Sequence, residues 1–158
     1  IKKHFGTSIP AKYAPNLPGD VGEQSAKTTK SKGCVKLVSI ARVSPEKNID
    51  FALQLLHEVK GKVEFDVYGS IYDKRYWKAC LRIMETLPGN VTVNYKDSLE
   101  PAEIRGTLQK GDFLLLPTTG ENFGHIIFES FSVGTPVIIS DQTPWRDLEK
   151  KKIHCLFH

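Results

Sequence analysis

The sequence predicts an α/β fold, a doubly wound parallel sheet with helices on both faces. Short β-branched and aliphatic runs alternate along the chain with segments whose apolar residues recur at helical spacing. This alternation is typical of βαβ units, in which a helix returns the chain to begin the next parallel strand. Residues 35–40 and 113–116 are apolar almost without interruption, as strands buried on both faces are.

Five strands are expected, and each is a short apolar or alternating run that ends at a loop. They are residues 35–40, 64–68, 91–95, 112–116 and 136–140. Five helices are expected between and after them, because apolar residues recur there at intervals of three and four. These helices are residues 49–56, 77–84, 101–108, 124–133 and 144–150. Pro101 suits the first turn of the third helix, and Gly134 ends the fourth.

The length and composition fit one globular domain with a tail. Of the 158 residues, 40% are apolar and 25% charged, and a net charge of +4 is too small to indicate a nucleic-acid partner. No apolar run is long enough to span a bilayer, and no export signal is visible. Three cysteines without CxxC spacing disfavour disulfides, so a cytoplasmic location is expected. Residues 1–33, rich in proline and polar residues, are expected to be a linker-like, partly disordered segment before a domain at 34–158.

Ligands of open α/β sheets bind at the carboxyl ends of the strands, where loops lead into helix N-termini. The loop at residues 41–48 places Arg42 and Lys47 just before a predicted helix. A planar guanidinium and a compact ammonium beside helix amides suit a phosphate or diphosphate. Taken alone, the two residues could equally be solvated cations on a surface loop with no ligand.

The loop at residues 117–125 leads into a helix that is apolar nearly all round, and we expect this helix to be buried. Glu129 is its one carboxylate, so it is expected either to pair with a lysine or arginine or to remain for a ligand. Glu121 lies before the helix, where the helix dipole alone would also favour an acid. Five helical rises, about 7 Å, separate Gly124 from Glu129, so the two carboxylates are expected to hold different parts of one extended ligand.

Other common sites are not indicated. No GxGxxG follows a strand and no GxxxxGK occurs, so dinucleotide and P-loop fingerprints are absent from the sequence. The five histidines show no metal-ligand spacing with the cysteines, so no metal site is expected.

The two glutamates and their surroundings resemble the C-terminal, nucleotide-sugar-binding half of the retaining GT-B glycosyltransferases of family 4, the glycosyl transferases group 1. That family's mark is two glutamates separated by seven residues, then a small-residue turn and Pro-Val, which here are Glu121, Glu129 and Pro136-Val137. Further segments similar to the family are Ala41-Arg42-Val43 with Lys47-Asn48, Tyr68-Gly69-Ser70, and the loop at residues 141–147. The resemblance covers residues 35–149.

The resemblance implies a Rossmann-like sheet of five to six strands, one half of a GT-B fold. It implies transfer of a hexose from a nucleoside diphosphate-sugar to an acceptor hydroxyl with retention. In this interpretation Arg42 and Lys47 bind the donor diphosphate without a metal, Glu129 binds the ribose, and Glu121 is the catalytic residue beside the sugar. It also implies that sugar and phosphate oxygens accept hydrogen bonds from the backbone amides of Asn122, Phe123, Gly124 and His125. The base would be bound by Tyr95 and Lys96.

The resemblance also implies no cofactor, and a separate N-terminal acceptor-binding domain that reaches a membrane surface or a lipid-linked acceptor. The setting would be polysaccharide biosynthesis in the cytoplasm or at the inner face of the membrane. Family members continue with a further strand and closing helices, so residues 34–158 are expected to be a truncated domain that binds donor but is inactive alone. Asn122 and Ser70 depart from the family pattern, which would shift the donor-sugar preference. Two alternatives stay open: another GT-B-like enzyme of the epimerase or phosphorylase class, and a non-enzymatic nucleotide-binding module.

Overall fold

A computed structural model of the chain describes residues 33–146 and residue 148. Within them lies a sheet of five parallel strands in the order β3-β2-β1-β4-β5. The strands are β1 (Cys34–Ile40), β2 (Lys62–Tyr68), β3 (Val91–Lys96), β4 (Phe113–Leu116) and β5 (Val137–Ile139). The expected α/β fold with its parallel sheet is confirmed.

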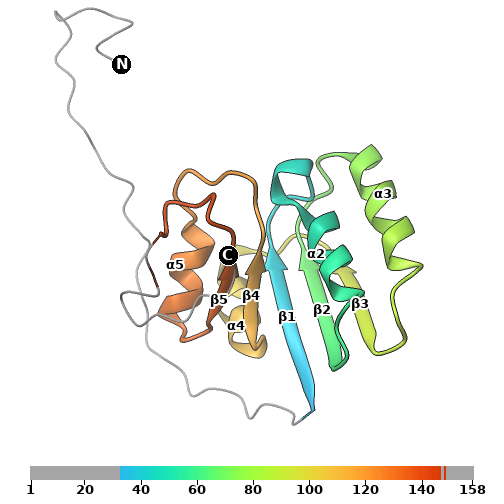
Figure 1. Cartoon of the computed structure of the whole chain (residues 1–158). Helices are drawn as coiled ribbons and strands as arrows, with labels where there is room; N and C mark the ends of the chain where they lie inside the picture. The colour runs from blue at the N-terminus through green and yellow to red at the C-terminus, as the bar shows by residue number, and fades with distance from the viewer. Residues whose placement is uncertain (1–32, 147, 149–158) are drawn as a thin grey trace, which may run out of the picture.

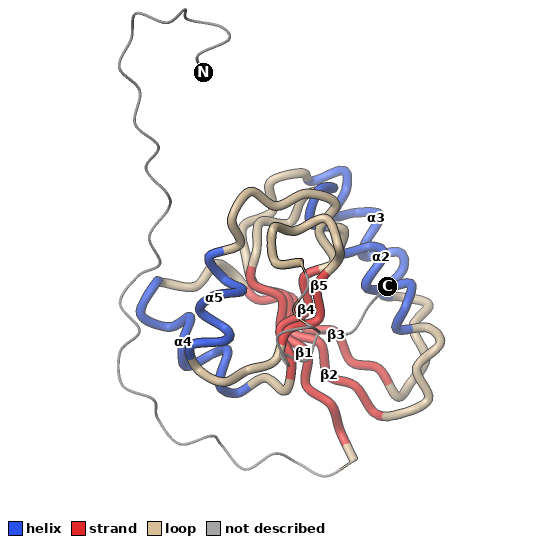
Figure 2. The backbone as a smooth tube through the Cα atoms, turned by 60° about the vertical axis from the view of Figure 1, so that its left-hand side comes forward, coloured by secondary structure: helices blue, strands red, loops and turns tan. Residues whose placement is uncertain are grey.

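Helices cover both faces of the sheet. They are α2 (Ile49–Leu56), α3 (Lys74–Met84), α4 (Pro101–Lys110) and α5 (His125–Ser132), with a 3-10 turn η1 (Pro45–Lys47) before α2. α2 and α3 lie on one face, and α4 and α5 on the other (Figures 1 and 2). Each face has its own apolar cluster, centred on Leu53 and Phe65 on the first and on Leu114 and Ile127 on the second.

Two of the helices, α3 and α4, begin where the sequence supplies side-chain caps. The side chain of Asp73 accepts hydrogen bonds from the amides of Arg75 and Tyr76 at 2.8 and 2.9 Å, which fixes the start of α3. Glu100 and Glu103 form a reciprocal capping box at the start of α4, and Pro101 occupies its first turn, as expected. Local chemistry therefore sets where α3 and α4 begin.

The backbone after β2 passes directly against the backbone after β1. The amide of Ala41 donates to the carbonyl of Tyr68 at 3.0 Å, and that of Val43 donates to Ser70 at 2.9 Å. Gly69 has φ +138°, and a Cβ at this position would lie 2.0 Å from the carbonyl oxygen of Ala41. Only glycine permits this approach, so the loop after β1 is fixed by its backbone.

Two expectations about helices are wrong. Residues 144–146 of the helix expected at 144–150 are not helical. The indole of Trp145 instead donates to the carbonyl of Phe123 at 2.6 Å, and its ring lies 5.7 Å from that of Phe131. α5 is not buried all round either, because Ile127 and Ser130 are its buried residues and its other apolar side chains are half-buried.

Some expectations lie outside the described residues. These are the linker at 1–33, apart from Gly33, and the end of the domain at 149–158.

Candidate functional site

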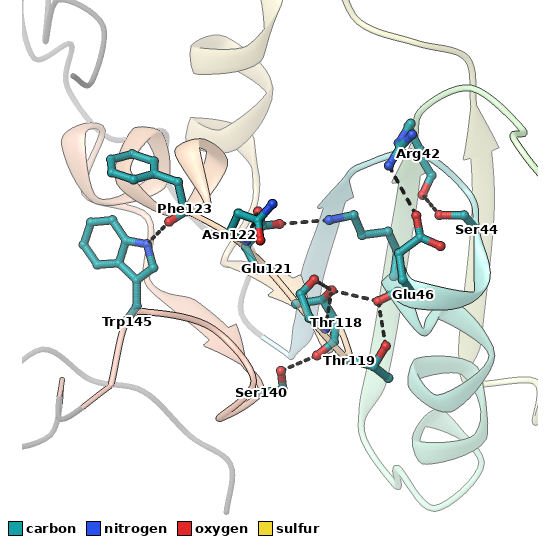
Figure 3. Close-up of polar contacts among 12 residues, drawn as sticks. Arg42, Ser44, Glu46, Thr118, Thr119, Glu121, Asn122, Phe123, Ser140 and Trp145 are labelled. Carbon is teal, nitrogen blue, oxygen red and sulfur yellow. Dashed lines mark hydrogen bonds and ion pairs between the residues drawn. The ribbon is translucent and has the colours of Figure 1, made fainter. Parts of the chain in front are cut away.

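The candidate site lies at the carboxyl edge of the sheet, between β1 and β4. β1 pairs with β2 on one side and with β4 on the other, so the loops after β1 and β4 lead to opposite faces. Such a switch in strand order is where ligands bind in open α/β sheets. The loop at 41–48, the loop at 117–124 and the segment at 140–145 meet here and are joined by hydrogen bonds (Figure 3).

Asn48 makes the first connection between the loops after β1 and β4. It has φ 57°, a left-handed conformation that asparagine adopts more readily than most residues, and it joins η1 to α2. Its side-chain amide donates to the carbonyl of Pro117 at 3.0 Å. The start of α2 is thereby fixed to the end of β4.

Thr118 makes the second connection, and no feature of the sequence singles it out. Its side chain is fully buried, and its hydroxyl lies 2.7 Å from the carbonyl oxygen of Glu46 and 2.8 Å from that of Gly120. The amide of Thr119 donates to the same Glu46 carbonyl at 2.9 Å. The hydroxyl of Ser140 donates to the carbonyl of Thr118, which joins the segment after β5 to the other two loops (Figure 3).

These connections hold Lys47 against Glu121. Lys47 Nζ lies 2.8 Å from Glu121 Oε2, and the two side chains are only 14% and 19% exposed. Burial alone would raise the pKa of the Glu121 carboxyl. The hydrogen bond and charge of Lys47, together with the amides of Phe123 and Asn122, lower that pKa by more than burial raises it. The pKa of Glu121 therefore lies below its usual range. A predicted phosphate-binding cation and the predicted catalytic carboxylate therefore form one ion pair.

Arg42, the other cation expected at a phosphate, has different partners. Its guanidinium lies 3.3 Å from Glu46 Oε1 and 5.0 Å from the centroid of the Tyr72 ring. The side chains of Arg42 and Glu46 are 56% and 43% exposed, so water screens their attraction. Figure 3 shows Arg42 beside Glu46 and away from Glu121. The guanidinium can therefore exchange its partner for a ligand with little loss of stability.

The turn between Glu121 and α5 is held by a glycine and a tryptophan. Gly124 has φ +76°, and a Cβ there would lie 2.8 Å from Ile127 Cδ1 and 3.1 Å from Trp145 Nε1. The indole N–H of Trp145 donates to the carbonyl of Phe123 at 2.6 Å (Figure 3). Trp145 thus takes a positioning role that the sequence did not indicate, since its neighbour Pro144 favoured a helix start.

The four backbone amides expected at the donor divide into two pairs. Those of Asn122 and Phe123 face the Glu121 carboxylate, and the Asn122 amide donates to Oε1 at 3.0 Å. Those of Gly124 and His125 have no acceptor among the residues that the structure describes. Unpaired amides at a helix N-terminus suit an anionic or hydroxyl-rich ligand.

Glu129 lies half-buried in α5. Within residues 33–146 and 148, its carboxylate forms no hydrogen bond and no ion pair, although its backbone carbonyl accepts a bond from the Ser132 hydroxyl at 2.7 Å. Of the two alternatives expected for this acid, the lysine or arginine partner is therefore not found in this part of the chain. A half-buried carboxylate in this state can accept hydrogen bonds from a ligand hydroxyl.

Tyr95 and Lys96, expected near the base, point to opposite faces because side chains alternate along β3. The Tyr95 hydroxyl donates to the carbonyl of Gly69 at 2.9 Å, and its ring lies 4.8 Å from that of Trp77. Lys96 Nζ lies 3.0 Å from Asp66 Oδ2. Neither side chain is bonded to the Lys47–Glu121 pair, and their assignment to the base stays a prediction.

Asp66 is a buried acid that the sequence analysis did not single out. Its position between Phe65 and Val67, in an otherwise apolar stretch of β2, could have identified it. Its side chain is 1% exposed and lies 3.2 Å from Lys36 and 3.0 Å from Lys96. Burial alone would raise the pKa of Asp66. Hydrogen bonds from Asn94, Lys96 and Lys36 lower it by more than this, so the pKa lies below its ordinary value. Its partners lie on the neighbouring strands, Lys36 on β1 and Asn94 and Lys96 on β3, so Asp66 joins the three strands.

Metal ligands and membrane spans were also sought within the described part of the chain. No group of three or more histidine, cysteine, aspartate or glutamate side chains there is placed to hold a metal ion. None of the helices there has the length and apolar character needed to cross a bilayer. Lys47 and Arg42 are the two cations that the loop after β1 places at this edge.

A model of the family described as "Glycosyl transferases group 1" matches residues 20–154 of the chain. No curated protein matches the sequence. The matched range contains every element of the sheet and every residue of the candidate site.

Solved structures of glycosyltransferases share the fold at low sequence identity. The lipopolysaccharide outer core galactosyltransferase WaaB in its apo form has a TM-score of 0.68 at 17% identity, over 82% of this chain and 36% of that one. Anabaena HepE with UDP and glucose has a TM-score of 0.63 at 19% identity, over 70% of this chain and 30% of that one. The catalytic domain of a cholesterol-α-glucosyltransferase from Helicobacter pylori has a TM-score of 0.59 at 18% identity, over 71% of this chain and 69% of that one.

The similarity to these structures confirms the Rossmann-like fold of one GT-B half. The chain spans about a third of the length of HepE and WaaB.

Proposed function

The chain belongs to the glycosyl transferases group 1 family, and from this premise we propose that its described domain binds the nucleoside diphosphate-sugar donor of a retaining glycosyltransferase. The observation that carries the proposal is the Lys47–Glu121 ion pair at the switch point, with the Glu129 carboxylate on the adjoining helix, which has no partner among the described residues. A nucleoside diphosphate-sugar is negatively charged at its centre and carries hydroxyls at both ends. One cation and two separate carboxylates match that pattern.

The site residues divide the donor between them. Lys47 binds the diphosphate, and Arg42 leaves Glu46 to join it, because its guanidinium is exposed and its present partner is weak. Glu129 accepts hydrogen bonds from the ribose hydroxyls. Glu121 accepts hydrogen bonds from the transferred sugar and orients it, and the amides of Gly124 and His125 bind sugar and phosphate oxygens.

The same residues support the chemical step. Negative charge develops on the leaving diphosphate as its bond to the sugar breaks. Lys47 and Arg42 offset that charge from fixed positions, which is electrostatic stabilisation and needs no metal ion. The loops joined by Thr118 and Asn48 hold Lys47 in place before the donor arrives.

The similar structures support the donor class and suggest the acceptor class. HepE has been solved with UDP and glucose and with UDP-glucose, while WaaB and the Helicobacter pylori enzyme are named for transfer to lipopolysaccharide and to cholesterol. We therefore propose hexosyl transfer to an acceptor hydroxyl of a glycan, a lipid-linked glycan or a small molecule, in the cytoplasm. Because the chain covers about a third of HepE and of WaaB, we also propose that acceptor binding uses further residues and that these 158 residues bind donor without transferring it.

Calorimetric titration of the chain with a panel of UDP- and GDP-sugars tests this function. Saturable binding of one donor class is expected. Glu129→Ala should weaken it by about tenfold or more, the effect of losing hydrogen bonds to a charged group. Glu58→Ala, which changes an exposed glutamate beyond the end of α2, is the matched control and should bind as the unchanged chain does. Absence of saturable binding, or equal binding by Glu129→Ala, would contradict the assignment.

A further inference from the structure

Tyr72, in the loop between β2 and α3, is the most exposed large apolar side chain in the described part of the chain. Its side chain is 70% exposed, and the next highest value, for Phe51, is 44%. The Tyr72 hydroxyl has no hydrogen-bond partner among the residues that the structure describes. Single exposed apolar residues are ordinary on a protein surface, so the role of this ring depends on what it contacts.

The backbone of Tyr72 is fixed against the loop after β1. The amides of Tyr72 and Asp73 both donate to the carbonyl of Val43, at 3.1 and 3.2 Å. Ile71, on the other side of Tyr72, pairs with Val43 in an isolated parallel bridge. The ring is therefore attached to a rigid backbone one residue away from Arg42 along the facing loop, although the ring itself is not packed in the core.

The ring contacts the Arg42 guanidinium. The Arg42 Cζ lies 5.0 Å from the centroid of the Tyr72 ring, within the distance of about 6 Å at which a ring face attracts a cation. The second contact of the guanidinium is the carboxylate of Glu46, at 3.3 Å (Figure 3). A bound phosphate would compete with Glu46 for the guanidinium N–H groups. It would not compete with the ring, so Arg42 can keep one contact while it exchanges the other.

The two contacts therefore affect ligand binding in opposite directions. Glu46 must be released before the guanidinium can bond to a phosphate, so this pair weakens binding. The ring confines the long Arg42 side chain, which is 56% exposed and would otherwise sample many conformations. Confinement before the ligand arrives lowers the entropic cost of binding.

We propose that Tyr72 is a positioning residue of the donor site, whose ring holds the Arg42 guanidinium at the carboxyl edge while this group exchanges Glu46 for the donor diphosphate. The inference rests on the proposed function, because it requires Arg42 to bind the diphosphate. In the ligand-free chain the ring attracts Arg42 for part of the time, and in the complex it does so throughout. The ring therefore strengthens binding by up to the full value of an exposed cation–π contact, about two- to fivefold.

Calorimetric titration of the full chain with UDP and with GDP tests this role, because both carry the diphosphate. Tyr72→Leu should weaken the nucleotide that binds by about two- to fivefold. Tyr72→Phe keeps the ring and should bind as the unchanged chain does. Phe51→Leu is the matched control, since it removes an exposed ring that lies over no cation of the described residues, and it should change nothing. Melting temperatures should match between all variants.

Two further measurements separate positioning from direct contact with the nucleotide. In the Arg42→Ala background, Tyr72→Leu should cause no additional loss of affinity, because the ring acts through Arg42. In the ligand-free chain, the side-chain protons of Arg42 should resonate upfield because they lie near the face of the Tyr72 ring. This NMR shift should disappear in Tyr72→Leu and persist in Tyr72→Phe.

Each contrary result has a distinct meaning. Ordinary Arg42 shifts in the ligand-free chain would overturn the stacked arrangement, whatever the chain binds. A loss by Tyr72→Leu that persists in the Arg42→Ala background would overturn the positioning role, because the ring would then contact the nucleotide itself. If nucleotide binding is weakened by Glu129→Ala but not by Tyr72→Leu, the positioning role alone fails. If neither nucleotide and no sugar donor binds, the proposed function fails and the positioning role fails with it.

Discussion

The two cations of the loop after β1 are five residues apart in the sequence but differ in how they are held. Lys47 is 14% exposed and reaches across to Glu121, which belongs to the loop after β4. Arg42 is 56% exposed and pairs with Glu46 of its own loop. Contacts between segments distant in sequence therefore fix one cation, while the other keeps its freedom.

The difference lies in the side chains and not in the backbone. At the Arg42 end, the backbone is fixed by the close approach of Gly69 to Ala41. At the Lys47 end, it is fixed by the bond from Thr118 to Glu46. A rigid loop that carries one fixed and one movable cation can present charge to a ligand and then close around it. Four substitutions test this comparison, from the largest expected effect to the smallest.

Gly69→Ala should be the most damaging. Its Cβ would lie 2.0 Å from the carbonyl of Ala41, and its φ of +138° is unfavourable for alanine. We expect the free energy of unfolding to fall by about 3 kcal/mol or more, measured by urea or thermal unfolding. Gly61→Ala is the matched control, because a Cβ there meets nothing within 4 Å. Equal stability of the two variants would show that the loops do not need this approach.

Thr118→Val should have the next largest effect. It keeps the shape of the side chain but removes a buried hydroxyl that bonds to Glu46 and Gly120, at a cost of about 1–3 kcal/mol. Because Lys47 would lose its fixed position, the pKa of Glu121 should rise toward its ordinary value, which carboxyl NMR can follow. Thr118→Ser keeps the hydroxyl and should leave this pKa in place. The interpretation fails if valine is harmless, or if serine is as harmful as valine.

Glu121→Gln should reveal the ion pair through its pH dependence. The pKa of Glu121 is lowered from its ordinary value of 4.5. The pair therefore stabilises the fold above that value, and the stabilisation is lost as the pH falls through the folded-state pKa. The free energy of unfolding of the variant should be lower than that of the unchanged chain by about 1 kcal/mol near pH 7, and this difference should shrink in acid. Glu46→Gln, which breaks the exposed pair, should show a much smaller deficit, and equal deficits would contradict the comparison.

Arg42→Ala should have the smallest effect on stability. The Arg42–Glu46 pair is exposed, so its loss should cost only about 0.2–0.5 kcal/mol. Donor affinity should nevertheless fall about tenfold, because a charged contact to the diphosphate is removed. Melting temperature and calorimetric titration of the same sample separate the two quantities. A stability loss as large as that of Thr118→Val would mean that Arg42 supports the fold instead.

Most of the fold could be predicted from the sequence because its signals are local. The apolar spacing in α2 and the proline at the start of α4 are readable from neighbouring residues alone. The helix expected at residues 144–150 was wrongly predicted because the contacts that decide this segment are not local. Trp145 there bonds to Phe123 and packs on Phe131, contacts that depend on how the chain returns to itself.

The sequence predicted which residues belong to the site but not which of them pair with one another. Lys47 and Glu121 were both singled out, yet their contact depends on a register between loops that are far apart in the sequence. Thr118 carries no signal, since a threonine after a strand is ordinary loop chemistry. The opposite directions of Tyr95 and Lys96 were readable in principle, because neighbouring residues of a strand face opposite sides.

The central claim is that a nucleoside diphosphate-sugar binds at the carboxyl edge between β1 and β4. Amide chemical-shift mapping of the full chain, titrated with the donor found by calorimetry, tests it most directly. We expect the largest shifts in the loops at 41–48 and 117–125 and around Glu129, with little change in α3. Saturating donor that leaves these residues unshifted, or that shifts residues elsewhere on the sheet, would contradict the account.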